Sequence, residues 1–223
     1  MLPITIRRLR VTTVVLLGAA GLMSAHAASL GGIDAGSLDA WVYPADIDVG
    51  PVACASFDLP GGSLDGQPVG CGGGTWTTSG GNWRIVNGEA KATTRESIAT
   101  ITGPSPYMSA SVDVIDASKK NREGGILISH DATAGTYLAA VIVGPGVVEL
   151  RSTNSVLAAT TASIGPSTRL GITRTDTTAT VTVDGAVVIS IPLPSNLLPG
   201  TGAGLYHGGG PPVSFDNFQF DFP

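Results

Sequence analysis

Acidic residues that share one face of a strand are the first candidates for acid–base chemistry in this chain. Hydrolysis of a glycosidic bond with retention needs two carboxylates about 5–5.5 Å apart, and residues i and i+2 of a strand share a face. None of the four glutamates has an acidic residue two positions away; they are Glu89, Glu96, Glu123 and Glu149. The glutamates therefore offer no such pair along a strand.

Ser129, His130 and Asp131 place the three residue types of a hydrolytic triad in a row. Adjacent residues of a regular strand point to opposite faces, so Ser129 and His130 cannot meet as nucleophile and base. The strained G-x-S-x-G turn that exposes a nucleophilic serine is also absent from the sequence. His130 is in phase with Ile126 and Ile128, and we expect it at the rim of a sheet.

His207 precedes one of two glycine-rich segments, GCGGG (70–74) and GGGPP (208–212). We expect His207 at the start of a loop and more exposed than His130. Two isolated histidines do not supply the ligands of a zinc site. Neither glycine-rich segment joins a strand to a helix, so a phosphate-binding loop is excluded and tight turns are expected.

The elements that position these residues are predicted to be strands. From about residue 55 onward, runs rich in Val, Ile, Thr and Leu are broken by Gly, Pro, Asn and Asp about every ten residues, which is typical of a β-sandwich. No window combines a helical period with helix caps. We expect strands at 106–115, 125–130, 136–143, 146–152, 168–175 and 213–222.

Two hairpins are predicted from their turn residues. Asn-Gly at 87–88 and Asp-Gly at 184–185 supply the two positive-φ positions of a type I′ turn between short apolar runs. In the second hairpin, Val181 alternates with Thr180 and Thr182, so one face of the sheet is apolar and the other polar. Trp83 is in phase with Ile85, which favours a place in the core. Trp76 lies among glycines and remains open as a ligand-stacking ring.

The order of these segments resembles a known family of folds. ASFDLPGGSLDG (55–66), GTWTTSGGNWRIVNGEA (74–90) and SVDV (111–114) begin the match, and GGILISHDATAGTYLAAVIV (124–143), TATVTVDGAVV (178–188) and VSFDNFQF (213–220) complete it. Together they are similar to the concanavalin A-like, laminin G-type jelly rolls. The resemblance implies an all-β, antiparallel two-sheet jelly-roll sandwich over residues 55–223, with first and last strands close together.

The same resemblance implies two further expectations. Laminin G-type modules often hold Ca²⁺ with loop aspartates, so Asp58 and Asp216 are candidate calcium ligands if the terminal strands pair. The alternative is that each aspartate stabilises a turn. Jelly-roll glucanases carry a Glu-x-Asp-x-(x)-Glu run, and this sequence has none. No other cofactor is expected.

The N-terminus has the features of a secretory signal peptide. Arg7, Arg8 and Arg10 precede an uncharged apolar run at 11–23, and Ala25-His26-Ala27 is a small-x-small cleavage pattern. Thirteen apolar residues are too few to span about 30 Å of hydrocarbon. We therefore predict a signal peptide at 1–27, a lead-in segment at 28–54, one jelly-roll domain at 55–223, and no membrane span in the mature chain.

Charge and cysteine content restrict the partners. Cleavage would remove three of the 12 basic and none of the 17 acidic residues, leaving a net charge of −8. This acidic balance with scattered Lys and Arg argues against binding nucleic acid. Cys54 and Cys71 are an even pair in an exported chain, which predicts a disulfide rather than a metal site or a reactive thiol.

The leading hypothesis is a secreted, non-catalytic module that binds a glycan or another cell-surface ligand. Polar groups beside aromatic rings suit sugars, and the candidate residues are His130, Asp131, Tyr137, Tyr206 and His207. One alternative is a polysaccharide hydrolase or lyase with a site that the sequence does not reveal. Another is a structural component of the cell surface, held through sheet edges.

Overall fold

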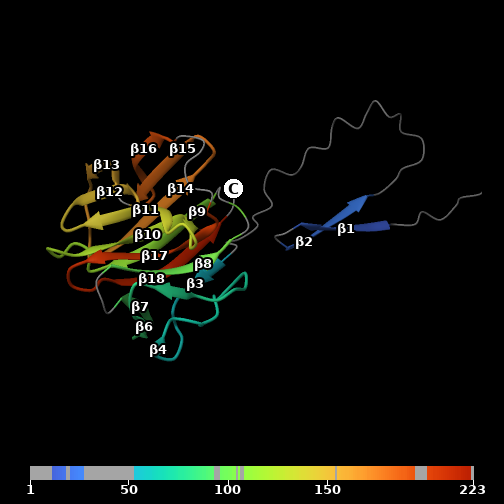
Figure 1. Ribbon diagram of the computed structural model, residues 1–223, viewed down its shortest axis with the longest axis horizontal. Helices are drawn as coiled ribbons and strands as arrows, with labels where there is room; N and C mark the ends of the chain where they lie inside the picture. The colour runs from blue at the N-terminus through green and yellow to red at the C-terminus, as the bar shows by residue number, and fades with distance from the viewer. Residues whose placement is uncertain are drawn as a thin grey trace, which may run out of the picture. The chain divides into compact units, whose positions relative to one another are not determined.

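The computed structural model describes residues 12–18, 21–27, 53–92, 96–103, 105, 108–153, 155–193 and 200–221 (Figure 1). The chain divides into two compact units, Met1–Asp48 and Val49–Pro223. In the first unit, β1 (Thr12–Gly18) and β2 (Gly21–Ala27) form an antiparallel hairpin. Cleavage after Ala27 stays a prediction. Of the expected lead-in segment 28–54, only the last two residues lie within the described part of the chain.

Two antiparallel sheets build the second unit. The seven-stranded sheet has the order β13-β12-β11-β10-β17-β8-β5, and the larger sheet has the order β16-β15-β14-β9-β18-β7-β6-β4, with β3 paired to β18. The strands are β3 (Ala53–Ala55), β4 (Gly62–Ser63), β5 (Thr77–Ser79), β6 (Trp83–Val86), β7 (Glu89–Ala92), β8 (Ser97–Thr102), β9 (Met108–Ile115), β10 (Glu123–Asp131), β11 (Thr136–Val143), β12 (Val147–Ser152), β13 (Ser155–Thr161), β14 (Ser167–Arg174), β15 (Thr178–Val183), β16 (Ala186–Pro192), β17 (Gly202–Gly209) and β18 (Ser214–Asp221).

The strand order confirms the all-β sandwich. All the described strand pairs are antiparallel, and the first strand of this unit, β3, pairs with the last, β18. The described residues contain no helix, and accordingly none that is long and apolar enough to cross a membrane. β3 begins at Ala53, two residues before the start that the sequence suggested for the sandwich.

Both predicted hairpins are present, and their turns have the predicted conformation. Asn87 (φ 56°) and Gly88 (φ 78°) connect β6 to β7, and Asp184 (φ 49°) and Gly185 (φ 81°) connect β15 to β16. Two successive positive φ values give the twist that matches a β-hairpin. The local sequence therefore fixes both connections.

Both central tryptophans belong to the core between the sheets. Trp83 is 1% exposed and its ring centroid lies 5.5 Å from that of Phe215. Trp76 is also 1% exposed and lies between Phe57 and Phe218, at 5.7 Å and 5.1 Å. The core position predicted for Trp83 is confirmed, and Trp76, which the sequence left open, is not available for stacking on a ligand.

The disulfide joins the start of the sandwich to the loop that follows β4. Cys54 of β3 is bonded to Cys71, 17 positions along the chain, as the even cysteine count predicted. The backbone N–H groups of Gly70 and Cys71 both donate to the carbonyl oxygen of Cys54. The disulfide and these hydrogen bonds tie the glycine-rich segment 70–74 to β3, which itself pairs with the central strand β18.

Candidate functional site

The outer face of the seven-stranded sheet carries a small apolar cluster that is separate from the core. Along β11, Leu138 and Ala140 face the core between the sheets, while Ala139 and Val141 belong to a separate cluster on the opposite face. We call this second cluster the apolar floor; it consists of Leu127, Ala139, Val141 and Tyr206, with Ile98, Tyr137 and Val143 packed against it. The four members are themselves buried, with Tyr206 only 6% exposed, so the partly exposed side chains of Ile98, Tyr137 and Val143 form the accessible surface of the floor.

Two tyrosines lie together on the apolar floor. The rings of Tyr137 from β11 and Tyr206 from β17 are 5.8 Å apart and tilted by 46°. Tyr137 is half-buried, and its hydroxyl donates to the carbonyl oxygen of Thr153 at 3.4 Å. Burial, followed by the proximity of Tyr206, raises the pKa of Tyr137 to about 12, so both the ring and a neutral hydroxyl are presented at physiological pH.

A shallow depression of about 340 Å³ opens beside this tyrosine pair. Its lining adds residues that sequence reasoning did not single out as ligand contacts: Ser79, Gly80, Glu96, Ser97 and Ile98. Register explains how they come together, because Tyr206 is opposite Ile98, and Ile98 is opposite Ser79. No local pattern in the sequence signals a grouping that depends on three-strand register.

A β-bulge at Ser129 turns His130 onto the same outer face. Ser129 has φ 54°, and β10 gains one residue relative to both neighbouring strands between Ile128 and Asp131. The Ser129 hydroxyl accepts a hydrogen bond from buried Arg174 at 2.7 Å, so it faces the core. A bulge of this kind shifts the alternation by one residue, which places His130 out of phase with Ile126 and Ile128. Ser129 cannot serve His130 as a nucleophile in this arrangement.

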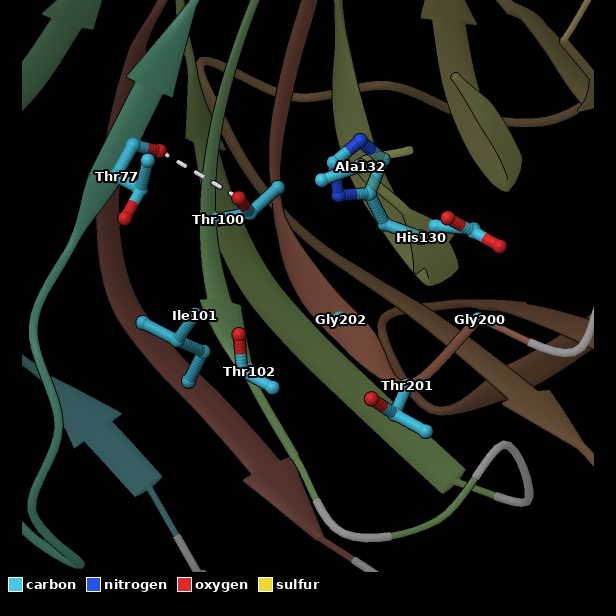
Figure 2. Close-up of a pocket in the computed structure, with 10 residues that line it drawn as sticks. Thr77, Thr100, Ile101, Thr102, His130, Ala132, Gly200, Thr201 and Gly202 are labelled. Carbon is cyan, nitrogen blue, oxygen red and sulfur yellow. Dashed lines mark hydrogen bonds between the residues drawn. The ribbon is translucent and has the colours of Figure 1, made fainter. Parts of the chain in front are cut away.

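His130 lines a second depression of about 370 Å³, at the end of the sheet (Figure 2). Three threonines, Thr77, Thr100 and Thr102, come from β5 and β8. Gly202 of β17 lies between them and His130, because it pairs with Thr102 on one side and with His130 on the other. Gly202 lies directly against His130, since a Cβ there would come within 3.0 Å of the His130 Cβ. The depression thus presents an imidazole and several hydroxyl groups.

The charge states around His130 suit contacts with neutral hydroxyls. Burial lowers the pKa of His130, and the carboxylate of Asp131 offsets only part of this effect. The imidazole is therefore neutral at pH 7, with one nitrogen that donates and one that accepts. Asp131 has a structural task as well, because its Oδ1 accepts from the amides of Thr133 and Ala134 at 2.8 Å and 3.0 Å.

His207 does not join this site, and the expectation that it is exposed is wrong. It lies within β17, in phase with the core residues Ala203 and Leu205, and is 1% exposed. Tyr206 precedes it and faces the other side of the sheet. The error arose because the glycines at 208–210 suggested a loop, whereas β17 continues to Gly209.

Two glutamates that are distant in sequence meet on the outer face. Arg151 of β12 contacts Glu149 through Nε at 2.7 Å and Glu123 through Nη1 at 3.1 Å. Sequence spacing could not reveal this pair, because Glu123 and Glu149 belong to strands that are two apart in the sheet. Both carboxylates accept hydrogen bonds from the same guanidinium, so neither is placed as a free proton donor.

The two candidate calcium ligands influence each other electrostatically. Burial raises the pKa of Asp216, and the charges of Asp58, Asp113 and Glu89 raise it further. Asp216 also accepts from the amide of Asn217 at 2.7 Å. Among the described residues, no group of three or more His, Cys, Asp or Glu is placed to hold a metal ion. Calcium binding at Asp58 and Asp216 therefore stays a prediction.

The architecture is that of a concanavalin A-like jelly roll, and the comparisons with solved structures agree. No protein-family model matches the chain, and no curated protein matches it either. The carbohydrate binding module CBM66 from Bacillus subtilis has 17% identity and a TM-score of 0.51, over 66% of this chain and 92% of that chain.

Glycoside hydrolases are among the similar structures as well. The endo-β-1,3-glucanase from Pyrococcus furiosus has 10% identity and a TM-score of 0.55, over 76% of this chain and 93% of that chain. The Bacillus licheniformis β-glucanase has 11% identity and a TM-score of 0.52, over 76% of this chain and 97% of that chain. At these identities the likeness establishes the fold alone, and one fold hosts both binding and catalysis.

Proposed function

We propose that this protein is a secreted, non-catalytic module that binds a glycan on the outer face of its seven-stranded sheet. The observation that carries the proposal is the tyrosine pair on the apolar floor, which lines an open depression. A sugar ring has an apolar face and a rim of hydroxyls, so it needs an aromatic surface beside neutral polar groups. The half-buried ring of Tyr137, which packs against the buried Tyr206, supplies the first, and His130 with the threonines of β5 and β8 supplies the second.

The comparisons support a glycan as the ligand. One similar structure is named as a carbohydrate binding module, and several others are named as glucanases. Secretion is supported by the leader-like N-terminus and by the Cys54–Cys71 disulfide, since disulfides persist in oxidising compartments. A glycan displayed at a cell surface is therefore an accessible ligand, whereas recognition of a cell-surface protein has no comparable support.

A hydrolase is the second candidate, and the meeting of Glu123 and Glu149 is the observation that favours it. Two carboxyl groups on one open face are the minimum for glycoside hydrolysis. Such an enzyme also needs one of them as a proton donor, and both instead accept from Arg151. Binding without catalysis is therefore the better account of this geometry.

A glycan array probed with the purified protein tests the proposal. We expect selective binding to an oligosaccharide, weakened in Tyr137→Ala and retained in Val187→Ala, an exposed position on β16 of the other sheet. Absence of selective binding, or equal loss in both variants, would contradict it. In parallel, the array ligand is incubated with wild type and with Glu149→Gln. Cleavage that the substitution abolishes would favour the hydrolase.

A further inference from the structure

A third depression lies outside the proposed glycan site, at the opposite end of strand β10 from His130. It has a volume of about 560 Å³ and is enclosed by the β9–β10, β11–β12 and β17–β18 connections. Its lining consists of residues 120–123, 143–145, 209 and 210. We call it the basic-loop pocket, because Lys120 and Arg122 both line it.

Positive charge is concentrated around this pocket. Lys119, Lys120 and Arg122 fall within four positions of a chain whose net charge is −5. Asp116 pairs with two of them, accepting from Lys119 at 2.7 Å and from Arg122 Nη1 at 3.3 Å. The carboxylate of Glu123 also lines the pocket, but it is paired with Arg151 at 3.1 Å. Lys120 is exposed and forms no ion pair with any residue that the structure describes. The loop therefore has excess positive charge facing an open cavity.

Backbone contacts fix the shape of the basic loop. The carbonyl oxygen of Arg122 accepts from the amide of Gly144 at 2.8 Å. Gly210 packs so closely on the other side that a Cβ there would overlap the carbonyl oxygen of Asn121. Asn121 itself has φ 62°, a conformation that closes a tight turn. A preorganised loop loses little entropy when it binds a ligand.

The pocket is continuous with the apolar floor. Glu123, which lines the pocket, extends its Oε2 toward Gly208 and Arg151. A Cβ at Gly208 would lie 2.5 Å from Glu123 Oε2 and 2.9 Å from the Tyr206 hydroxyl oxygen, so glycine keeps these two side chains close. A saccharide on the tyrosine pair could therefore extend into the basic-loop pocket.

We propose that the basic-loop pocket binds the carboxylate of a uronic acid, so that the protein recognises a saccharide with an acidic residue at this end. This inference rests on the proposed function in one respect: the uronic acid is part of the saccharide that binds at the tyrosine pair. Lys120 and Arg122 supply the opposite charge, and the volume admits a sugar ring as well as its carboxylate.

The test is a pair of ligands that differ only in charge. Glucuronate and its uncharged methyl ester are titrated into the ¹⁵N-labelled protein at low ionic strength. We expect glucuronate to shift the amide signals of residues 120–122, 144, 209 and 210, and the ester to leave them unchanged. Lys120→Gln should weaken glucuronate binding about fivefold, the effect of losing one exposed ion pair. Lys91→Gln removes the same charge from β7 in the other sheet and should leave binding unchanged.

Several results would overturn the proposal. They are equal shifts with both ligands, no shifts at these residues, or equal weakening in Lys120→Gln and Lys91→Gln. Shifts with inorganic sulfate but not with glucuronate would indicate an adventitious ion only. The glucuronate titration tests this pocket without involving Tyr137, whereas the glycan array tests the tyrosine site. Failure of one proposal can therefore be told from failure of the other.

Discussion

Replacing Tyr137 with alanine should weaken glycan binding while leaving the fold intact. The substitution removes the ring that lies 5.8 Å from Tyr206 on the apolar floor. An aromatic contact is worth about 0.5–1.5 kcal/mol beyond the buried area, so affinity should fall about two- to tenfold. Because Tyr137 is only half-buried, the free energy of unfolding should fall by no more than about 2 kcal/mol.

Calorimetric titration with the array ligand, together with chemical unfolding, measures both quantities. Tyr137→Phe is the matched control: it keeps the ring and loses the hydroxyl, with its 3.4 Å hydrogen bond to Thr153 and its interaction with Tyr206, so its affinity should stay within about twofold of wild type. An alanine variant that binds as tightly as wild type would refute the role of the ring. A phenylalanine variant as weak as the alanine variant would show that the hydroxyl, not stacking, determines affinity.

Four further predictions concern stability and titration. Trp83→Ala should lower the free energy of unfolding by about 3–5 kcal/mol in a denaturant titration, because it removes a fully buried ring. Reduction of Cys54–Cys71 should cost about 3 kcal/mol, and without reductant neither cysteine should react with an alkylating agent in intact-mass analysis. The pKa of Tyr137 is raised to about 12 from 10.0, so its stabilising contribution should be present below pH 10 and lost between pH 10 and 12. Denaturation midpoints of wild type and Tyr137→Phe across that range measure the loss. The pKa of His130 is lowered from 6.5, so the folded state favours the neutral imidazole. The free energy of unfolding should therefore be highest above pH 6.5 and fall as the pH drops below it, and NMR titration of the imidazole should show the lowered pKa.

Elements that depend on local sequence could be predicted. The Asn-Gly and Asp-Gly turns require positive φ at two successive residues, and few other dipeptides allow it, so both hairpins were found at their true positions. Trp83 was assigned to the core because it shares a strand face with Ile85, and both are buried. β11 was predicted at its observed bounds, Thr136–Val143.

Elements that depend on neighbouring strands could not be predicted. β17 contains four glycines and was not among the predicted strands, yet Gly204 is needed because a Cβ there would overlap the carbonyl oxygen of Ala99 on β8. His207 was misplaced for the same reason. The meeting of Glu123, Glu149 and Arg151 also depends on register across three strands, which no spacing within one strand encodes.

The position of His130 in the candidate site could not be predicted from the sequence for a different reason. Period-two alternation would place His130 on the core face together with Ile126 and Ile128. One extra residue at Ser129 reverses this, and the bulge is held by the buried hydrogen bond from Arg174. A serine at this position carries no sequence signal for positive φ, so the outward position of His130 follows only from the tertiary structure.

Chemical-shift mapping of the array ligand on the ¹⁵N-labelled protein tests the central claim most directly. The account predicts that the largest changes fall on the outer face of the seven-stranded sheet, at Tyr137, Tyr206, His130 and Gly202. Changes confined to the nine-stranded sheet, or to the edge strands β13 and β16, would contradict a glycan site on this face.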